Sequence, residues 1–502
     1  MKTPTFSEAL KTSRATVYGV ILNDHDSLSR MGGTLTEAPY KGAPQAPVLY
    51  IKPANPFNGD QAEVKLPMAA ADLEVGATIG IVIAHSAARL SLESAATAIA
   101  GYVIVADLSL PHSSYYRPAI REKCFDGACV ISDQMIPADT IAHPGSLEIV
   151  TLINGQEAER RSLSDLVRDI PSLLRDVSAF MSLRSGDVLL VGVKWQAARA
   201  SAGDQVSLRV TGLGQLDFSI AAAVPVHSTQ ATPATGKGKR SIGRIFFNGA
   251  IHEVEPVRDG APEAQASIRL ADGTILKHSE AHWLPPIEPG SIFALGLNYA
   301  DHARELAFKA PEQPLVFLKG PGALSGHLSH SRRPADATYM HYECELAVVI
   351  GKHARNVSRA DAYDYVAGYT VANDYAIRDY LENYYRPNLR VKNRDACTPL
   401  GPWLVEAGAV ADPMNLVLTT SVNGKVTQRG NTADMVFDIP ALIAYLSSIM
   451  TLSPGDIILT GTPEGLADVV AGDCIVTSIE GIGSLTNTIV SDDHYFQPTV
   501  AR

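Results

Sequence analysis

The sequence predicts an α+β fold dominated by strands, and it predicts that this fold occurs twice in one chain. The chain has 502 residues, more than one hydrophobic core usually organises. An internal repeat connects its two halves. In each half, short β-branched segments bounded by glycine, proline or Asn-Gly outnumber the helical segments.

The internal repeat has a nearly constant spacing. The tetrapeptide YYRP occurs at 115–118 and again at 384–387, which is 269 residues later. The same spacing connects Asn154-Gly155 with Asn423-Gly424, Asp169-Ile170-Pro171 with Asp438-Ile439-Pro440, Gly186-Asp187 with Gly455-Asp456, and Gly212-Leu213-Gly214 with Gly481-Ile482-Gly483. Upstream the spacing becomes 267, which pairs Asp107 with Asp374. Such matches indicate a duplication, so we expect both halves to share one fold.

The repeat divides the chain into four segments. We expect a first domain at 15–220, a smaller strand-rich segment at 243–288 and a second domain at 289–502. Residues 221–242 are rich in Ala, Thr, Pro, Gly and Lys and show no periodicity, which indicates a flexible linker.

In the second domain the predicted strands outnumber the predicted helices. The β-branched strand candidates are 346–350, 366–371, 416–422, 456–460 and 474–479. Two segments are predicted to be helical, 359–365 and 439–449. The second of these has Pro440 at a permitted first-turn position.

Composition excludes several classes of partner. The formal charge is −11 and the pI is about 5.7. Nucleic acids and anionic membranes both need a basic footprint, so we expect neither as a partner. No apolar stretch approaches the ~18–20 residues that span a bilayer, and the first residues lack the apolar core of a signal peptide. We therefore expect a cytoplasmic protein, and the sequence leaves open whether it is a homo-oligomer.

Two glutamates lead directly into a predicted strand. Period-2 geometry points Glu343 and Glu345 to the same face. Two like charges beside a buried strand repel each other unless a cation lies between them. On the pair alone, a metal site and an exposed strand edge with two solvated glutamates are equally favoured.

A third carboxylate shifts this balance toward a metal. Asp374 follows the apolar segment 366–371, and three carboxylates form an oxygen-rich half-shell that suits Mg²⁺ or Mn²⁺ rather than zinc. Several cationic residues follow, which suit an anionic substrate: Arg378, Arg386, Arg390 and Lys392. Each of them, taken alone, is more often a surface charge.

Two further patterns are weaker. His302 and Glu305 are spaced i, i+3, so a carboxylate on one helical turn would orient the imidazole as an acid/base pair. The segment 460–465, TGTPEG, offers backbone N–H groups and the Thr462 hydroxyl to an anion. The alternatives are a chance H-x-x-E pattern and a simple Gly/Pro turn.

Together these segments resemble the fumarylacetoacetate hydrolase family. The resemblance rests on L-N-Y-x-x-H-x-x-E at 297–305, E-x-E at 343–345, Asn-Asp at 373–374, Lys392 and G-T-P-x-G at 461–465, and it covers 243–495. It implies two tandem domains with a mixed β-sandwich or roll. It assigns metal binding to Glu343, Glu345 and Asp374, catalytic roles to His302, Glu305 and Lys392, and substrate binding to Arg378, Lys319 and Thr462.

The tandem arrangement is similar to family members that act as isomerase and decarboxylase in aromatic catabolism. That implies a Mg²⁺- or Mn²⁺-dependent enzyme acting on a small unsaturated 2-oxo tricarboxylate or dicarboxylate. The alternative is a hydrolase of acylpyruvates or fumarylacetoacetate that uses the same metal. A non-catalytic scaffold is disfavoured, because the carboxylate set is intact in the second half only.

The first half lacks the carboxylate pair. The spacing of 267 places Gly76 and Thr78 where the second half has Glu343 and Glu345. It retains Asp107, Lys52 and Lys123. One carboxylate does not hold Mg²⁺ against water, so we expect this half to be metal-free. We favour a structural role over metal-independent proton transfer by Lys123 and Asp107.

Overall fold

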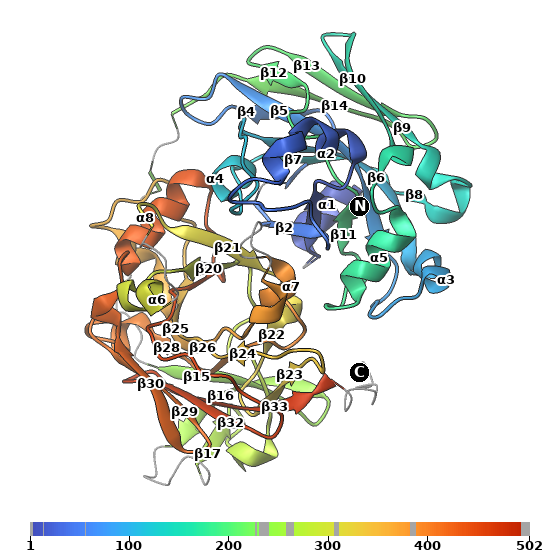
Figure 1. Ribbon diagram of the computed structural model, residues 1–502. Coiled ribbons are helices and arrows are strands. Elements are labelled where there is room, and N and C mark those ends of the chain that lie inside the picture. The colour runs from blue at the N-terminus through green and yellow to red at the C-terminus, as the bar shows by residue number, and fades with distance from the viewer. Residues whose placement is uncertain are drawn as a thin grey trace. The chain divides into compact units, whose positions relative to one another are not determined.

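The computed structural model describes residues 4–13, 15–55, 57–225, 228–229, 240–257, 266–305, 311–381 and 388–492. The chain divides into two compact units, one with the described residues up to 225 and the other with most of those from 228 onward (Figure 1). Among the described residues, no helix is long and apolar enough to cross a membrane.

The first unit contains two sheets. The larger has the strand order β2-β1-β11-β5-β6-β7-β3, with β12 paired to β5 and β8 to β6. Its strands are β1 (Val17–Ile21), β2 (Val48–Lys52), β3 (Phe57–Asn58), β5 (Asp72–Ile83), β6 (Ile99–Ser109), β7 (Cys129–Ile131), β8 (Ile136–Pro137), β11 (Val188–Leu190) and β12 (Arg199–Ser201). The smaller has the order β10-β9-β13-β14-β4, with β4 (Ala62–Lys65), β9 (Glu148–Ile153), β10 (Gln156–Ser162), β13 (Gln205–Val210) and β14 (Gly214–Ala221).

The second unit repeats this topology. Its larger sheet contains the path β28-β26-β25-β31-β20-β21, and its smaller sheet has the order β23-β33-β32-β29-β30. The strands are β20 (Ile292–Gly296), β21 (Leu315–Lys319), β23 (Ser329–Arg333), β25 (Cys344–Ile350), β26 (Val366–Asn373), β28 (Thr398–Glu406), β29 (Val417–Val422), β30 (Lys425–Asn431), β31 (Ile457–Leu459), β32 (Cys474–Ile479) and β33 (Gly483–Ser491). The matching orders confirm that the two halves share one strand-dominated fold.

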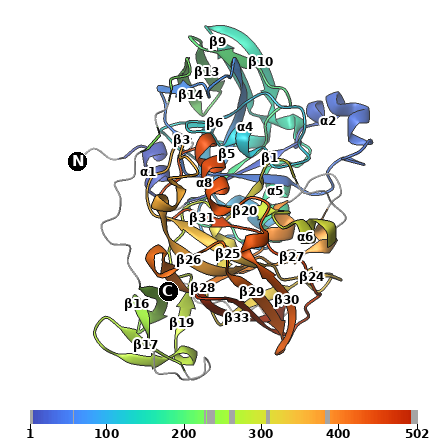
Figure 2. The same ribbon diagram turned by 90° about the vertical axis from the view of Figure 1, so that its left-hand side faces the viewer.

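A small group of strands extends the larger sheet of the second unit. These are β15 (Ser241–Phe247), β16 (Ala250–Val257), β17 (Ser267–Leu270), β18 (Ile275–Lys277) and β19 (His282–Leu284). β15 joins the main sheet through antiparallel pairing with β28. Figure 2 shows β16, β17 and β19 at the edge of this unit. Five strands therefore lie among the residues described between 241 and 284, and the treatment of 243–288 as a segment of its own stays a prediction.

The helices are few and mostly short. They are α1 (Phe6–Thr12), α2 (His25–Met31), α3 (Leu92–Ala95), α4 (Ile120–Lys123), α5 (Ile170–Ser178), α6 (Ala300–Glu305), α7 (Leu389–Lys392) and α8 (Ile439–Ile449). α8 matches the predicted helix 439–449, and Asp438 caps it by accepting the Ala441 N–H at 2.8 Å.

One predicted helix is wrong. In place of a helix at 359–365 the chain forms a turn and then a short 3₁₀ helix, Ala362–Tyr365. The Ser358 hydroxyl accepts the N–H of Asp361, and the four residues of the 3₁₀ helix are too few for a stable α-helix. The second YYRP copy and most of the predicted linker 221–242 lie outside the described residues.

Strand β25 shows how the sequence places charge in the core. All seven of its residues are buried, and β26 and β31 flank it on either side. Such a central strand accommodates long apolar side chains on both faces. The carboxylate at Glu345 is therefore fully enclosed, with 0% exposure.

Candidate metal centre and its surroundings

The pairing of β25 with β26 brings three carboxylates together. Cys344 lies opposite Asn373 in this antiparallel ladder, and the Asp374 N–H donates to the Glu343 carbonyl at 2.9 Å. Glu343, Glu345 and Asp374 each contribute one oxygen to a group in which all three atoms lie within 4.8 Å of one another. All three side chains are buried.

Two lysines contact this cluster but do not neutralise it. Lys392 Nζ lies 2.6 Å from Glu343 Oε2 and 2.9 Å from Asp374 Oδ2. Lys319 Nζ lies 2.6 Å from Asp374 Oδ1 and also donates to the Lys392 carbonyl. Two ammonium groups face three carboxylates, so a fully ionised cluster retains one excess negative charge.

Glu345 is the carboxylate with the least compensation. Its Oε2 accepts the Gly461 N–H at 2.8 Å, whereas its Oε1 is buried and accepts no hydrogen bond from the described residues. Burial, followed by repulsion from Asp374 and Glu343, raises the pKa of Glu345 well above its usual range. A hard divalent cation fits these oxygen donors, because it supplies the positive charge that the two lysines leave missing.

The loop after β31 lies against the carboxylates. Gly461 has φ +87°, and a Cβ there would lie 3.0 Å from the Asn298 Cβ, so the position requires glycine. The neighbouring Thr462 Oγ1 accepts from Gln428 Nε2 at 2.9 Å. Thr462 thus lies beside the cluster, and its role in substrate binding stays a prediction.

The predicted His302–Glu305 pair forms on α6. Nδ1 of His302 lies 3.2 Å from Glu305 Oε2. Glu305 Oε1 accepts the N–H groups of Gly465 at 3.1 Å and Leu466 at 3.3 Å. The pair is therefore fastened to the same loop that contacts Glu345.

Lys319 and Arg378 differ in their availability to a substrate. The Lys319 side chain is fully buried and is committed to Asp374 and to the Lys392 carbonyl, which favours positioning of Asp374 over direct contact with a substrate. Arg378 begins the 3₁₀ helix Arg378–Tyr380 and is half-buried. The substrate-binding roles of both residues stay predictions.

Sequence reasoning missed His341. It lies in β24 (Met340–His341), is 1% exposed, and its Nδ1 lies 3.6 Å from Glu343 Oε1. Burial, then the charges of Lys392 and Arg378, lowers its pKa well below the usual range. The signal was available, because His341 precedes Glu343 by two residues and period-2 geometry places both on one face.

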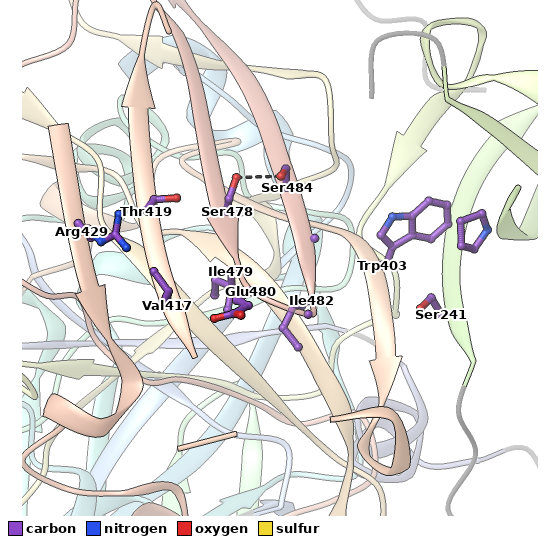
Figure 3. Close-up of a pocket in the computed structure, with 13 residues that line it drawn as sticks. Ser241, Trp403, Val417, Thr419, Arg429, Ser478, Ile479, Glu480, Ile482 and Ser484 are labelled. Atoms are coloured by element: carbon purple, nitrogen blue, oxygen red, sulfur yellow. Dashed lines mark hydrogen bonds between the residues drawn. The ribbon is translucent and has the colours of Figure 1, made fainter. Parts of the chain in front are cut away.

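A separate groove of about 750 Å³ opens on the second unit. Figure 3 shows Trp403, Arg429 and Glu480 among its lining residues. None of the three carboxylates lines it, so it is distinct from the candidate metal centre.

The first repeat retains one of the three carboxylates and both lysines. Gly76 lies opposite Asp107 in the β5–β6 ladder. Lys52 Nζ lies 2.5 Å from Asp107 Oδ1, and Lys123 Nζ lies 2.7 Å from Oδ2. Tyr50, at the place of Phe317, donates its hydroxyl to Asp107 Oδ2. We call Tyr50, Lys52, Asp107 and Lys123 the Asp107 network; its one carboxylate is already fully compensated.

The fold and this cluster define a class of protein. The family model described as "Fumarylacetoacetate (FAA) hydrolase C-terminal" matches residues 16–221 and 291–490. The chain belongs to this family and carries its domain twice.

One relative matches 96% of the chain, and two solved structures each match half of it. The chain is 43% identical over 480 residues to the "4-hydroxyphenylacetate degradation bifunctional isomerase/decarboxylase" of Escherichia coli, covering 96% of this chain and 99% of that protein. It is 38% identical to the structure of a 5-carboxymethyl-2-hydroxymuconate delta-isomerase from Mycobacterium smegmatis, with a TM-score of 0.44 over 50% of this chain and 98% of that one. It is 29% identical to a maleylpyruvate hydrolase from Sphingobium sp. SYK-6 crystallised with manganese(II) and pyruvate, with a TM-score of 0.42 over 50% and 99% of the two chains.

Metal titration should give one site per chain. The second repeat has three carboxylates in reach of one another, whereas Gly76 and Thr78 remove two ligands from the first repeat. We expect isothermal calorimetry with Mg²⁺ or Mn²⁺ to show a stoichiometry of one. Two equivalent sites would contradict the divergence of the two halves.

Proposed function

We propose that this chain is a decarboxylase and isomerase of 4-hydroxyphenylacetate catabolism. It would act as a 5-oxopent-3-ene-1,2,5-tricarboxylate decarboxylase and a 2-hydroxyhepta-2,4-diene-1,7-dioate isomerase. The observation that carries the proposal is the buried, undercompensated carboxylate cluster. It occurs in a chain 43% identical to a bifunctional isomerase/decarboxylase along 96% of its length. The cytoplasmic location expected from the sequence is part of this proposal.

The carboxylate cluster supports a dependence on Mg²⁺ or Mn²⁺. Glu343, Glu345 and Asp374 would hold the cation. The cation would supply Lewis-acid stabilisation of the enolate that develops when a conjugated carboxylate leaves as carbon dioxide.

The protein's own residues would hold the substrate and move its protons. Lys392, 8% exposed beside Glu343 and Asp374, and the half-buried Arg378 provide cationic partners for the substrate carboxylates. His302, oriented by Glu305, would carry the proton for ketonisation of the dienol. Both reactions pass through a dienolate, and they differ in the carbon that receives the proton.

One observation favours a second candidate function, carbon–carbon bond hydrolysis. The His302–Glu305 pair fastened to the 460–465 loop has the geometry of a base that activates water. A hydrolase of acylpyruvates or fumarylacetoacetate would use the same carboxylate cluster.

A product assay separates the two candidates. The pure protein with Mg²⁺ is incubated with the carboxylated dienoic 2-oxo acid and, separately, with an acylpyruvate. We expect carbon dioxide from the first and no pyruvate from the second. Release of pyruvate without carbon dioxide would establish the hydrolase instead.

A further inference from the structure

Gln428 is a buried amide on β30 that bonds two parts of the candidate metal centre at once. Its side chain is 2% exposed. Its Nε2 donates to the Thr462 hydroxyl oxygen at 2.9 Å and to the Pro463 carbonyl at 2.8 Å. Its Oε1 accepts the Thr420 hydroxyl at 3.0 Å and, at 3.4 Å, the N–H of Cys344, the residue between the two glutamates of the carboxylate cluster. The amide therefore makes all four hydrogen bonds of which it is capable.

The backbone partners of Gln428 fix the orientation of its amide. A carbonyl only accepts a hydrogen bond and an N–H only donates one, so the Pro463 carbonyl requires Nε2 and the Cys344 N–H requires Oε1. One hydrogen of Nε2 goes to Pro463 and the other to Thr462 Oγ1. Because Thr462 Oγ1 accepts this bond, the hydrogen of its own hydroxyl is directed to a different group.

The Thr462 hydroxyl is a buried donor beside the carboxylate cluster. The residue is 2% exposed, and no residue in the described ranges accepts its hydroxyl hydrogen. The preceding residue, Gly461, donates its N–H to Glu345 Oε2 at 2.8 Å, which places Thr462 next to the cluster. Buried polar groups nearly always find a partner, so this donor indicates an oxygen acceptor that a ligand supplies.

The first repeat has lost this arrangement together with the carboxylate pair. Gln428 on β30 and Glu159 on β10 occupy the same register, each opposite a threonine of the neighbouring strand. The spacing of 269 places Val193 where the second repeat has Thr462. The amide donor and the hydroxyl that it orients are thus both replaced in the repeat that lacks the glutamates.

Another buried amide is retained in both repeats. Asn298 Nδ2 donates to the Thr460 carbonyl at 2.8 Å, and Asn23 Nδ2 donates to the carbonyl of Val191, which lies 269 residues before Thr460, at 2.9 Å. The shared fold therefore keeps the amide that it needs in each half. Gln428 is replaced where the carboxylates are replaced, which favours a role in the site over a role in the fold.

The packing of Val193 shows which part of the cluster the Thr462 position faces. A Cβ added to Gly76 would lie 2.9 Å from Val193 Cγ1. Gly76 stands at the place of Glu343, so the shared fold puts the Thr462 side chain near Glu343. Lys392 Nζ also lies there, 2.6 Å from Glu343 Oε2. A hydroxyl donor and an ammonium group near one another suit a carboxylate.

We propose that Gln428 is a positioning residue, which holds the Thr462 hydroxyl so that its hydrogen is donated to a carboxylate oxygen of a 2-oxo acid bound at the cluster. The choice of a 2-oxo acid rests on the proposed function, in which such a compound is the substrate. Gln428 itself does not contact the substrate, because its four hydrogen bonds are all made within the chain. Without the amide the hydroxyl rotates, and an anion must then order it on binding.

The test is a double-mutant cycle on the full chain, measured as the Kd of 2-oxoglutarate in saturating Mg²⁺. Thr462→Val removes the hydroxyl and should raise Kd about 10-fold or more, the scale of a hydrogen bond to a charged group. Gln428→Met has a similar length without the amide and should raise Kd about 3- to 10-fold. Because Gln428 acts through Thr462, it should have no further effect in the Thr462→Val background. Additive effects would show that Gln428 acts on the fold and would overturn the proposal.

Two further variants serve as rescue and control. Thr462→Ser retains the hydroxyl and should bind 2-oxoglutarate like wild type. Thr419→Val makes the matched change on β29, where Thr419 lines the separate groove (Figure 3), and its Kd should be unchanged. A wild-type Kd for Thr462→Val, or no binding of 2-oxoglutarate by the wild-type chain with Mg²⁺ bound, would also overturn the proposal.

A second substitution covers the case in which Gln428→Met does not fold in a thermal melt. Gln428→Glu retains an oxygen for the Thr420 hydroxyl and the Cys344 N–H and replaces the donor nitrogen by an acceptor oxygen. The Thr462 hydroxyl would then donate to this oxygen instead of the probe. Kd should rise by at least as much as for Gln428→Met, and a wild-type Kd would contradict the positioning role.

Calorimetry with Mg²⁺ alone separates this inference from the proposed function. Thr462→Val and Gln428→Met retain all three carboxylates, so their Mg²⁺ affinity should equal that of wild type. If the wild-type chain binds no Mg²⁺, the proposed metal-dependent function fails and this inference fails with it. If it binds Mg²⁺ and the Kd of 2-oxoglutarate is the same in Gln428→Met, only this inference fails.

Discussion

Replacing Glu345 by glutamine is expected to abolish metal-dependent turnover and to weaken Mg²⁺ binding about 100-fold or more, since even changes behind a metal ligand cost about 10- to 100-fold. Glu345 is fully buried, its Oε1 accepts no hydrogen bond from the described residues, and its Oε2 holds the Gly461 N–H. Glutamine preserves the volume and removes the anionic charge that the cation needs.

The same substitution should leave the fold intact without metal. Without metal, burial and repulsion from Asp374 and Glu343 raise the pKa of Glu345 and favour its neutral form, so the neutral amide costs little and the unfolding temperature should stay equal or rise. Calorimetry gives the metal affinity and a thermal melt gives the stability. Glu480→Gln, an exposed position on the same unit, is the control and should retain both activity and affinity. Full activity of Glu345→Gln in Mg²⁺ would contradict the assignment.

Lys392→Ala should lower decarboxylation about 10²-fold or more, the scale of losing one preorganised charge-stabilising group. Lys392 Nζ contacts both Glu343 and Asp374, whereas Lys319 Nζ contacts Asp374, so the substitution removes the ammonium group that lies against Glu343. The matched variant in the first repeat combines Lys123→Ala with Asp107→Ala. It removes the equivalent contact of 2.7 Å and should leave decarboxylation nearly unchanged.

Both reactions must be measured for each variant, because proton transfer needs no carbon–carbon cleavage and is able to proceed without a metal. If the first-repeat double variant stops isomerisation and spares decarboxylation, the duplication has divided two reactions between two sites. If it lowers both rates equally together with the unfolding temperature, the first repeat acts through packing. A loss of decarboxylation at unchanged stability would contradict the assignment of this step to the second repeat.

Much of the fold followed from local patterns. The strand at 474–479 and the helix at 439–449 match the structure. In each segment the apolar residues recur at one consistent spacing, and turn residues lie at both ends. The segment 359–365 does not match, because a helix of so few residues is marginal by itself and the chain forms a turn followed by the 3₁₀ helix Ala362–Tyr365.

The features of the candidate site also fall into those that the sequence predicts and those that only the tertiary structure shows. The duplication and the carboxylate set were determined by the sequence itself. The spacing of the repeat can be recognised without knowing any tertiary contact, and the two-residue period of a strand places Glu343 and Glu345 on one face. The enclosure of Glu345, the pairing of Lys319 with Asp374 and the bond of Gln428 to Thr462 were decided only by the tertiary structure. Lys319 and Asp374 are 55 residues apart in the sequence, and Glu345 and Gly461 are 116 residues apart. Strand register and sheet packing bring such residues together, and no local pattern records which charges are thereby left without a partner.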